Sequence, residues 1–330
     1  MPPSSALAAV PESPTRVHIT GAEGSLAARV LALLDEDPNV VDGSAAESDV
    51  VVHLGAGEHD LRARRRENLT DGAAEMLADA TGGHAAHLVL VSSAMVYGAY
   101  ANNPVPLTED ALLRPDVEFV YARQLAAIEA LADRWRRAAP GRTVTVLRPV
   151  IAMAADGTSS LARALAAGLG QRVGEDDPAA QFLHLDDLAA AVVLAVGRRL
   201  DGVYNVAPDG WVPAERVRAL TGARPRIRLP ERVAEVVAAV RWRFQRGPIP
   251  PGLHSYTREP WLVANDRLKA QGWTPTVTNE QAYVEGTESR WWTMITPKRR
   301  QEITMGAMVA AGTGAAVGVL IGVRSWRRRR

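Results

Sequence analysis

The chain has 330 residues, no cysteine and a formal net charge of +1 at pH 7. This length is enough for one large α/β domain and a smaller lobe. The lack of cysteine excludes disulfides, thiolate catalysis and cysteine-based metal sites, and we name no metal-binding residues. The charge is uneven: residues 298–330 hold eight basic residues and one acid, which leaves a net charge of −6 on the chain before them. An acidic body argues against nucleic-acid binding, which needs a basic surface.

The N-terminal part of the chain predicts a leader, then a strand, a glycine turn and a helix. Residues 1–14 are rich in proline, serine and alanine and lack the basic start and apolar run of a signal peptide, so we expect a disordered leader and a cytoplasmic body. The strand covers residues 16–20, and the helix after the turn carries an apolar stripe of Leu26, Val30, Leu31 and Leu34. This succession is typical of a loop that holds a dinucleotide pyrophosphate at a helix N-terminus.

The glycine turn itself has the sequence TGAEGSLA at residues 20–27. Gly21 and Gly24 permit a tight turn and a close approach of the ligand to the backbone, and Ala27 stands where a third glycine often lies. Glu23 is unfavourable in such a loop, because its carboxylate would repel a pyrophosphate. The alternative is a glycine turn that only packs the helix on the strand.

A buried strand is expected at residues 49–54, whose apolar residues on both faces suit the centre of a parallel sheet. Too few residues separate it from the first helix for a strand and a full crossover helix, which indicates a trimmed βα unit with residues 39–42 as the remaining strand. Asp42 lies near the spacing of about 20 residues at which an acid binds the adenosine ribose, and this would favour NAD over NADP. The alternative is a turn acid before Gly43.

The remaining elements continue the alternation of helices and strands. We expect a helix over 61–80 and another over 188–196, with strands at 88–93, 144–147, 181–184 and 202–207. Such alternation predicts a parallel sheet with helices on both faces, and ligands in such sheets bind at the C-terminal ends of the strands. We therefore predict a dinucleotide-binding domain over 15–207 and a small C-terminal lobe over 208–290, with a helix near 233–244.

Taken together, these segments resemble the extended short-chain dehydrogenase/reductase family, of the NAD-dependent epimerase/dehydratase type. The resemblance rests on TGAEGSLA at 20–27, VVHLGAG at 51–57, Asn68, SSAMVYG at 92–98, Tyr121, LRP at 147–149, HLDDLA at 184–189 and GVYNVA at 202–207. It implies a Rossmann-like doubly wound parallel sheet, here with one βα unit trimmed. It also implies NAD as the cofactor, with NADP as the less favoured alternative.

The resemblance implies a role for each matching residue. Ser93 would hydrogen-bond the reacting carbonyl or hydroxyl, Tyr121 would be the general acid/base, and Asn68 would be a structural and proton-relay position. The expected cofactor contacts are Gly21, Gly24 and Ala27 under the pyrophosphate, Leu54 and Gly55 beside the nucleotide, and Pro149 and Val150 at the nicotinamide. Tyr97 would line the substrate pocket.

Structural roles remain open for several of these side chains. Ser93 could simply cap its strand end, and Tyr121 could be a buried helix tyrosine. The acids and histidines expected to be structural are His53, His184, Asp186 and Asp187, the two acids as helix caps and turn residues.

Leu125 departs from the family pattern. Four residues after the tyrosine the family places a lysine, which would share a helix face with Tyr121. A lysine there would hold the nicotinamide ribose and lower the pKa of the phenol, because a nearby cation favours the phenolate. Leucine does neither, so the pKa of Tyr121 would lie near its ordinary value of about 10, or above it if the ring is buried.

The C-terminal segment predicts a membrane helix. Residues 305–323 are uncharged and just long enough to span a bilayer core, and Trp291, Trp292 and Trp326 flank them. Within the segment Gly314, Gly318 and Gly322 recur every four residues, a spacing that lets two helices approach closely and favours a homodimer. We expect residues 291–330 to be a membrane-associated helix with a basic tail; the alternative is an Ala/Gly-rich helix docked on the body.

Two functions are consistent with these patterns. The first is a membrane-tethered NAD(P)-dependent oxidoreductase or epimerase that acts on a sugar nucleotide or lipid-linked substrate. Its candidate diphosphate partners are Arg163, Arg172, Arg224, Arg226 and Arg228. The second is a catalytically silent dinucleotide-binding or empty scaffold that organises partners at the membrane. Leu125 favours the second function, whereas Ser93, Tyr97 and Tyr121 favour the first.

Overall fold

The computed structural model describes residues 14–21, 24–54, 69–169, 178–221 and 251–287. They belong to the first of two compact units, Met1–Thr287 and Glu288–Arg330. Several predictions lie outside the described residues: the leader, Gly55, Asn68, the helix near 233–244, and the segment 305–323 with Gly314, Gly318 and Gly322. No helix within the described ranges is long and apolar enough to cross a membrane.

The centre of the first unit is a six-stranded sheet in which every pair of neighbours is parallel. Its strands, in spatial order, are β2 (Val40–Asp42), β1 (Thr15–Thr20), β3 (Val50–His53), β4 (His87–Val91), β5 (Thr143–Pro149) and β8 (Gly202–Val206). All five residues of β4 are buried, as a strand covered on both faces requires. The predicted parallel α/β sheet is therefore confirmed.

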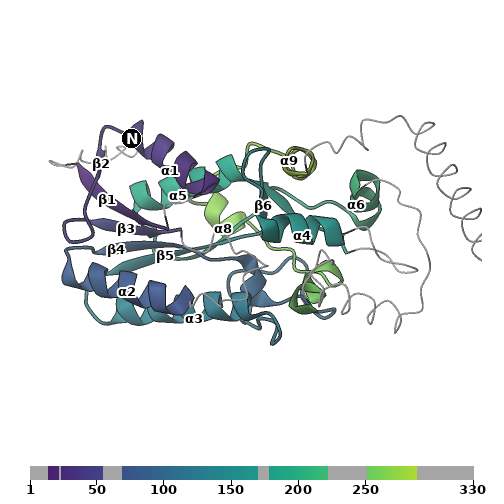
Figure 1. Ribbon diagram of the computed structural model, residues 1–330, viewed down its shortest axis with the longest axis horizontal. Coiled ribbons are helices and arrows are strands. Elements are labelled where there is room, and N and C mark those ends of the chain that lie inside the picture. The colour runs from purple at the N-terminus through teal and green to yellow at the C-terminus, as the bar shows by residue number, and fades with distance from the viewer. Residues whose placement is uncertain (1–13, 22–23, 55–68, 170–177, 222–250, 288–330) are drawn as a thin grey trace, which may run out of the picture. The chain divides into compact units, whose positions relative to one another are not determined.

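Two pairs of helices cover the two faces of this sheet (Figure 1). Helices α1 (Ser25–Asp35) and α5 (Leu185–Arg198) pack together on one face, and α2 (Leu69–Gly82) and α3 (Val120–Arg137) on the other. Helix α1 faces the core with Ala27, Val30 and Leu34, at the three-to-four-residue spacing of an amphipathic helix. Leu31, which we expected in that stripe, is 38 % exposed instead.

The connection between β2 and β3 contains no helix. Residues 43–49 lead directly from one strand to the other, as the trimmed βα unit predicted. Both Asp42 at the end of β2 and Val50 at the start of β3 pair with Val17 of β1. Strand β2 therefore ends three residues before the C-terminal end of β1, at Thr20.

The smaller part of this unit uses residues from several stretches of the chain. It contains β6 (Ile151–Met153) paired with β7 (Phe182–His184), the helices α4 (Ser160–Gly168), α6 (Ala214–Thr221), α8 (Asp266–Lys269) and α9 (Asn279–Gly286), and the short helices η2 (Pro251–Leu253) and η3 (Ser255–Thr257). The predicted strand at 181–184 thus pairs with β6 and not with the central sheet. A further short helix, η1 (Ala94–Tyr97), follows β4.

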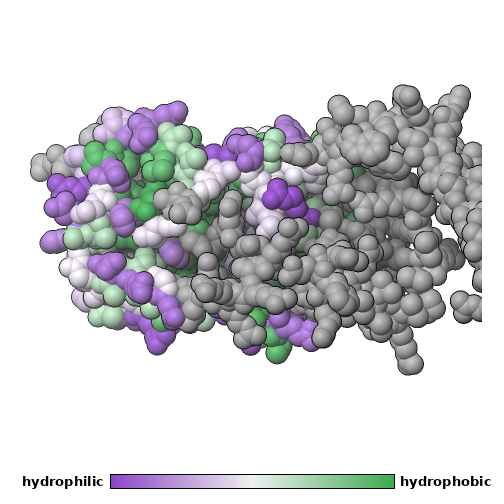
Figure 2. Space-filling model, in the orientation of Figure 1, coloured by the Kyte–Doolittle hydropathy of each residue, from purple (hydrophilic) through white to green (hydrophobic). Residues whose placement is uncertain are grey.

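The surface view in Figure 2 shows hydrophilic side chains over much of the described outer face. Apolar side chains gather near α1 and β2, where Leu31 and Val41 are each 38 % exposed. The large buried apolar side chains lie instead between the sheet and its helices, with Leu88, Leu90, Leu125 and Leu147 among the most deeply buried. These helices and strands fix the positions of the strand ends that form the site.

Candidate active site

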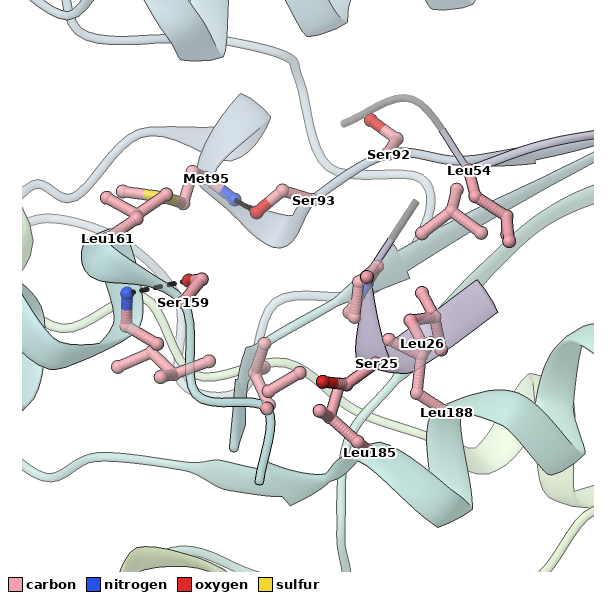
Figure 3. Close-up of a pocket in the computed structure, with 18 of the residues that line it drawn as sticks. Ser25, Leu26, Leu54, Ser92, Ser93, Met95, Ser159, Leu161, Leu185 and Leu188 are labelled. Atoms are coloured by element: carbon pink, nitrogen blue, oxygen red, sulfur yellow. Dashed lines mark hydrogen bonds between the residues drawn. The ribbon is translucent and has the colours of Figure 1, made fainter. Parts of the chain in front are cut away.

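A cavity of about 830 Å³, including its open mouth, lies at the C-terminal ends of the central strands. Its walls come from the start of α1, the ends of β3, β4 and β5, the start of α3, and the segment that runs through β6 into α4 (Figure 3). This is the edge at which open parallel α/β sheets bind ligands.

Most of the site residues expected from the sequence meet at this cavity. Those that line it are Gly24, Ala27, Leu54, Ser93, Tyr121, Pro149 and Val150. They are separated by up to 126 positions in the chain, and they come together because parallel strands place their C-terminal ends at one edge of the sheet. Asn68 and Gly55 lie outside the described residues.

Three predicted site residues do not line the cavity. Gly21 lies in the preceding turn with a φ of 69°, so it shapes the turn without facing the cavity. Asp42 is exposed and level with Val17, about 10 Å before the end of β1 at a rise of about 3.3 Å per residue. Its expected contact with the adenosine ribose therefore stays a prediction, with the carboxylate at the end of a shortened β2.

Tyr97 is likewise not part of the cavity wall, contrary to our expectation. It is fully buried: its hydroxyl donates to Asn205 Oδ1 at 2.8 Å and accepts from Arg148 Nη1 at 2.7 Å. Burial raises the pKa of Tyr97, although the Arg148 guanidinium opposes the shift. The residue is thus a structural tyrosine behind the site.

Ser93 directly precedes η1 and is its N-terminal cap. Its Oγ accepts a hydrogen bond from the Met95 amide at 3.2 Å, which is the capping role that we kept as an alternative. That bond uses an oxygen lone pair and leaves the hydroxyl proton able to donate. The residue therefore caps the short helix and can still donate to a ligand (Figure 3). The neighbouring Ser92 hydroxyl donates to Glu129 Oε1 at 2.6 Å.

Tyr121 is 5 % exposed and lies at the first turn of α3. Burial raises the pKa of its phenol well above the ordinary value of 10.0. Leu125, one turn further along the same helix, is 1 % exposed and places an apolar side chain where a lysine would lower that pKa. Tyr121 therefore holds its proton at neutral pH.

A buried ion pair lies behind the serines. Arg148 of β5 donates to both carboxylate oxygens of Glu129 on α3, from Nε at 3.1 Å and from Nη2 at 2.6 Å. Burial lowers the pKa of Arg148, but the hydrogen bonds and charge of Glu129 outweigh it, so the net pKa is raised. The sequence contained a signal for this pair that we did not use: an arginine inside an otherwise apolar strand needs a buried acid.

The four acids and histidines expected to be structural have structural contacts. His53 Nδ1 lies 2.7 Å from Thr20 Oγ1, and His184 caps α5 by accepting from the Asp186 amide. Asp187 accepts from the amides of Thr276 and Val277. The helix cap is thus His184 and not an aspartate. The described residues contain no group of three or more side chains that could hold a metal ion.

The loop after β6 closes on the start of α1. Ser25 Oγ donates to the Asp156 carbonyl at 3.0 Å, and Arg29 forms ion pairs with Asp156 and Asp186. A Cβ on Gly157 would lie only 2.4 Å from Ser25 Cβ, so this approach requires glycine. We did not anticipate these contacts, because nothing in the sequence links residues 25–29 to 154–159.

The cavity wall fits the pyrophosphate and nicotinamide parts of a dinucleotide. Helix α1 begins after Gly24, whose φ of 97° is strained for any other residue, and no side chain of the described residues caps it. Its first-turn amides therefore remain at the wall for an anionic ligand. Asp42, the acid expected at the adenosine ribose, is not among the described residues that line this cavity.

Fold and site together define a parallel, doubly wound α/β protein of the dinucleotide-binding class. Residues 28–207, more than half of the chain, match the NAD dependent epimerase/dehydratase family. The chain belongs to this family. That match begins just after the glycine turn and includes Ser93, Tyr121 and Pro149.

Comparison with known proteins agrees at the level of the fold. The structure of RMD from Pseudomonas aeruginosa complexed with NADPH has a TM-score of 0.58 at 20 % identity, over 83 % of this chain and 98 % of that one. UDP-glucose 4-epimerase from Thermus thermophilus, in complex with NAD, has a TM-score of 0.59 at 17 % identity over the same shares. At such identities the likeness shows the fold alone.

A curated relative is similar over part of its length. An uncharacterized protein of Mycobacterium tuberculosis is 28 % identical over 169 residues, which are 50 % of this chain and 45 % of that protein. The chain thus spans a little less than half the length of the curated relatives that it matches.

Proposed function

We propose that this protein binds NAD or NADP in the cavity and acts, as an oxidoreductase or epimerase would, on a hydroxyl or carbonyl group beside Ser93 and Tyr121. The observation that carries the proposal is the convergence of seven expected contact residues on one wall of one cavity. These residues are far apart in the sequence, so it is the fold, and not one local motif, that brings them together.

Each group of wall residues has a separate task in this proposal. The first turn of α1, from Ser25 to Ala27, would hold the pyrophosphate, and Pro149 with Val150 would lie against the nicotinamide. When bound, the nicotinamide supplies a hydride acceptor or donor. Ser93 would donate to the substrate oxygen and orient it.

Tyr121 would serve as a proton donor. Because burial raises the pKa of its phenol above 10, the neutral form predominates at pH 7. A neutral phenol can protonate an oxygen that gains charge, but it is a poor base for an alcohol at this pH. We therefore infer a slow proton transfer step in any reaction that begins with deprotonation of a substrate hydroxyl.

A second candidate function has its own supporting observation. Leu125 is buried beside the first turn of α3, where a lysine would activate Tyr121. This favours a catalytically silent dinucleotide-binding protein that serves as a scaffold. The two candidates share the cofactor site and differ only in turnover.

The test is a calorimetric titration of the full chain with NAD⁺, NADH, NADP⁺ and NADPH. The proposal requires binding of at least one of them, and no binding of any would reject it. Gly24→Ala should weaken binding about tenfold or more, since the strain at a φ of 97° would displace the wall. Gly141→Ala is the matched control, because Gly141 also has a positive φ, 83°, but does not line the cavity.

Membrane attachment of the C-terminus and pairing of two copies remain proposals based on the sequence. The uncharged segment 305–323 supports the first, and the spacing of Gly314, Gly318 and Gly322 supports the second. Flotation of the full chain with liposomes tests attachment. Val317→Arg should abolish flotation whereas Val317→Ala should not, and equal flotation of both variants would reject a spanning helix.

A further inference from the structure

The part of the cavity beyond Ser93 and Tyr121 has apolar walls. Met95 of η1, Leu161 and Leu165 of α4, and Trp261 lie along it. A narrow neighbouring hollow, with room for about one water molecule, shares Leu165 and Trp261 with the first cavity. Its other walls are equally apolar and include Leu169, Pro178, Ala180 and Leu262. The space next to the reacting group is therefore suited to hydrocarbon.

The aromatic and amide side chains in these walls use their polar atoms within the protein. Trp261 Nε1 donates to the Tyr256 carbonyl at 3.0 Å, and the Tyr256 hydroxyl donates to the Met95 carbonyl at 2.7 Å. Gln181 donates to two backbone carbonyls and accepts from the Val263 amide. These side chains present rings and methylene groups, and not spare donors, to a ligand.

Two of the serines that line the cavity also donate their hydroxyl protons within the protein. The Ser25 hydroxyl donates to Asp156 O and the Ser92 hydroxyl to Glu129. Ser93 and Ser159 differ, because each accepts from a backbone amide and so keeps its hydroxyl proton for donation (Figure 3). Apart from the amides of α1, which the proposed function assigns to the cofactor, the side chains of the described wall can thus bind one or two oxygen atoms, together with Tyr121.

Among the described residues that line either cavity, none is charged. Arg163, which we considered for a diphosphate, is exposed on α4 while its neighbour Ala162 lines the cavity. A diphosphate group is normally bound by arginine, lysine, a metal ion or a helix N-terminus. Of these, the first turn of α1 lines the cavity, and the proposed function assigns it to the cofactor, so the described wall beyond Ser93 and Tyr121 supplies no cation for a second diphosphate.

We propose that the substrate site takes an apolar alcohol or carbonyl compound, with one oxygen at Ser93 and Tyr121 and a hydrocarbon body against α4 and Trp261. This proposal rests on the proposed function for the reacting group, and it names the substrate class of that same site. It ranks a sugar nucleotide below such a compound, since the walls that the structure describes supply neither cations nor a set of donors for sugar hydroxyls. The other candidate diphosphate partners, Arg172, Arg224, Arg226 and Arg228, lie outside the described residues.

The test uses the full chain and a series of methyl ketones from 2-pentanone to 2-nonanone, with UDP-glucose as the sugar nucleotide. Calorimetry with saturating NAD⁺, which has no hydride to transfer to a ketone, measures affinity without turnover. Affinity should rise about threefold to fourfold for each added methylene, as burial of hydrocarbon predicts. UDP-glucose should bind at least tenfold more weakly than 2-nonanone.

A matched pair of variants locates the binding. Ala162→Phe should lower the affinity for 2-nonanone at least tenfold by filling the cavity, whereas Arg163→Phe adds the same ring to the exposed side of α4 and should leave it unchanged. Thermal unfolding of both variants checks the fold. If Ala162→Phe does not fold, Leu161→Glu places a charge on the same wall from a half-buried position.

The outcomes for the substrate class and for the cofactor are separate. Any one of three results would overturn the apolar substrate class. UDP-glucose could bind more tightly than the ketones, the ketone affinity could be independent of chain length, or both phenylalanine variants could bind the ketone equally. Any of these results would leave NAD(P) binding intact. The opposite result is also possible: the protein binds ketones, Ala162→Phe removes this binding, and no nicotinamide nucleotide binds. That result would support the apolar site and reject the proposed function.

Discussion

Arg148 and Glu129 form a two-pronged ion pair between β5 and α3, with both side chains at most 7 % exposed. The pair is part of a wider set of contacts, because Ser92 donates to the same carboxylate and Arg148 Nη1 donates to Tyr97. These contacts lie directly behind the wall that carries Ser92 and Ser93. The pair therefore holds the strand end on which the site is built.

Glu129→Gln should destabilise the protein by about 3 kcal/mol or more, because it leaves the buried guanidinium of Arg148 without its counter-charge. Urea unfolding measures this loss. The control is Asp133→Asn one turn later on α3, which breaks exposed ion pairs with Arg136 and Arg137 and should cost less than about 1 kcal/mol. Similar losses in both variants would show that the buried pair has no special role.

Leu125→Lys should bring the ionisation of Tyr121 toward neutral pH, because a cation one helical turn away favours the phenolate. With NAD⁺ and a secondary alcohol that the protein accepts, the wild-type rate should keep rising past pH 10, since burial holds the pKa of Tyr121 above that value. The lysine variant should level off at lower pH and be at least about tenfold faster at pH 7.

Leu125→Met is the uncharged control for this experiment. It changes the side chain at the same buried position without adding a charge, so its pH–rate profile should match that of the wild type. Equal profiles for the lysine and methionine variants would mean that residue 125 does not set the chemistry. The scaffold function would then be favoured.

Asp42→Asn should change the ratio of NAD to NADP affinity by less than about twofold. The carboxylate is level with Val17 and does not line the cavity, so it would not meet a 2′-phosphate. Calorimetric titrations of the variant and wild type with both nucleotides measure the ratio. A marked gain in NADP affinity would restore the ribose role expected from the sequence spacing.

His87 predicts a loss of stability in mild acid. Burial lowers its pKa to about 4 from the ordinary 6.5, and its Nδ1 lies 2.8 Å from Thr143 Oγ1. The unfolded chain binds a proton below about pH 6.5 and the folded chain only near pH 4, so stability is complete above pH 6.5 and falls as the pH drops toward 4. The total loss is about 3 kcal/mol at about 1.4 kcal/mol per pKa unit.

Urea unfolding at about pH 7.5, above both pKa values, and at about pH 4.5, between them, tests the role of His87. His87→Asn removes the titrating group, so the variant should lose less stability between these two conditions than the wild type. His84→Asn is the control, because His84 is an exposed histidine three residues earlier and should keep the wild-type pH dependence. An unchanged pH dependence in His87→Asn would assign the acid sensitivity to other groups.

The sheet was predictable from the sequence because its strands are short apolar runs separated by helix-length segments. The strands around Val50–His53 and Leu88–Val91 consist almost entirely of valine and leucine. Their burial on both faces follows from their place inside a parallel sheet. The absence of a crossover helix before β3 was also predictable, since chain length alone excludes it. The pairing of 182–184 with β6 was not, because strand partners outside the main alternation leave no local signal.

Site residues at the ends of strands could be predicted from the sequence. Those whose position depends on strand register or on irregular segments could not. Pro149 ends β5, and Val150 and Ser93 lie one and two residues beyond strand ends, so their position at the cavity follows from the fold. The position of Asp42 relative to the strand ends was not predictable, because sequence spacing does not reveal that β2 ends three residues before β1. Trp261 was not anticipated, since it reaches the cavity from a segment without regular structure.

The buried contacts around Arg148 have a consequence for hydrogen exchange. They connect α3, the end of β4, β5 and β8. They also include Glu109, whose Oε1 accepts a hydrogen bond from the backbone N–H of Asn205 at 3.0 Å. Strand β2 has three residues, all at least partly exposed, and pairs on one side only. Amides of β2 should therefore exchange by local fraying, whereas those of β4 and β5 should exchange only when the whole unit opens. The wall behind Ser93 is then the slowest-exchanging region of the described chain.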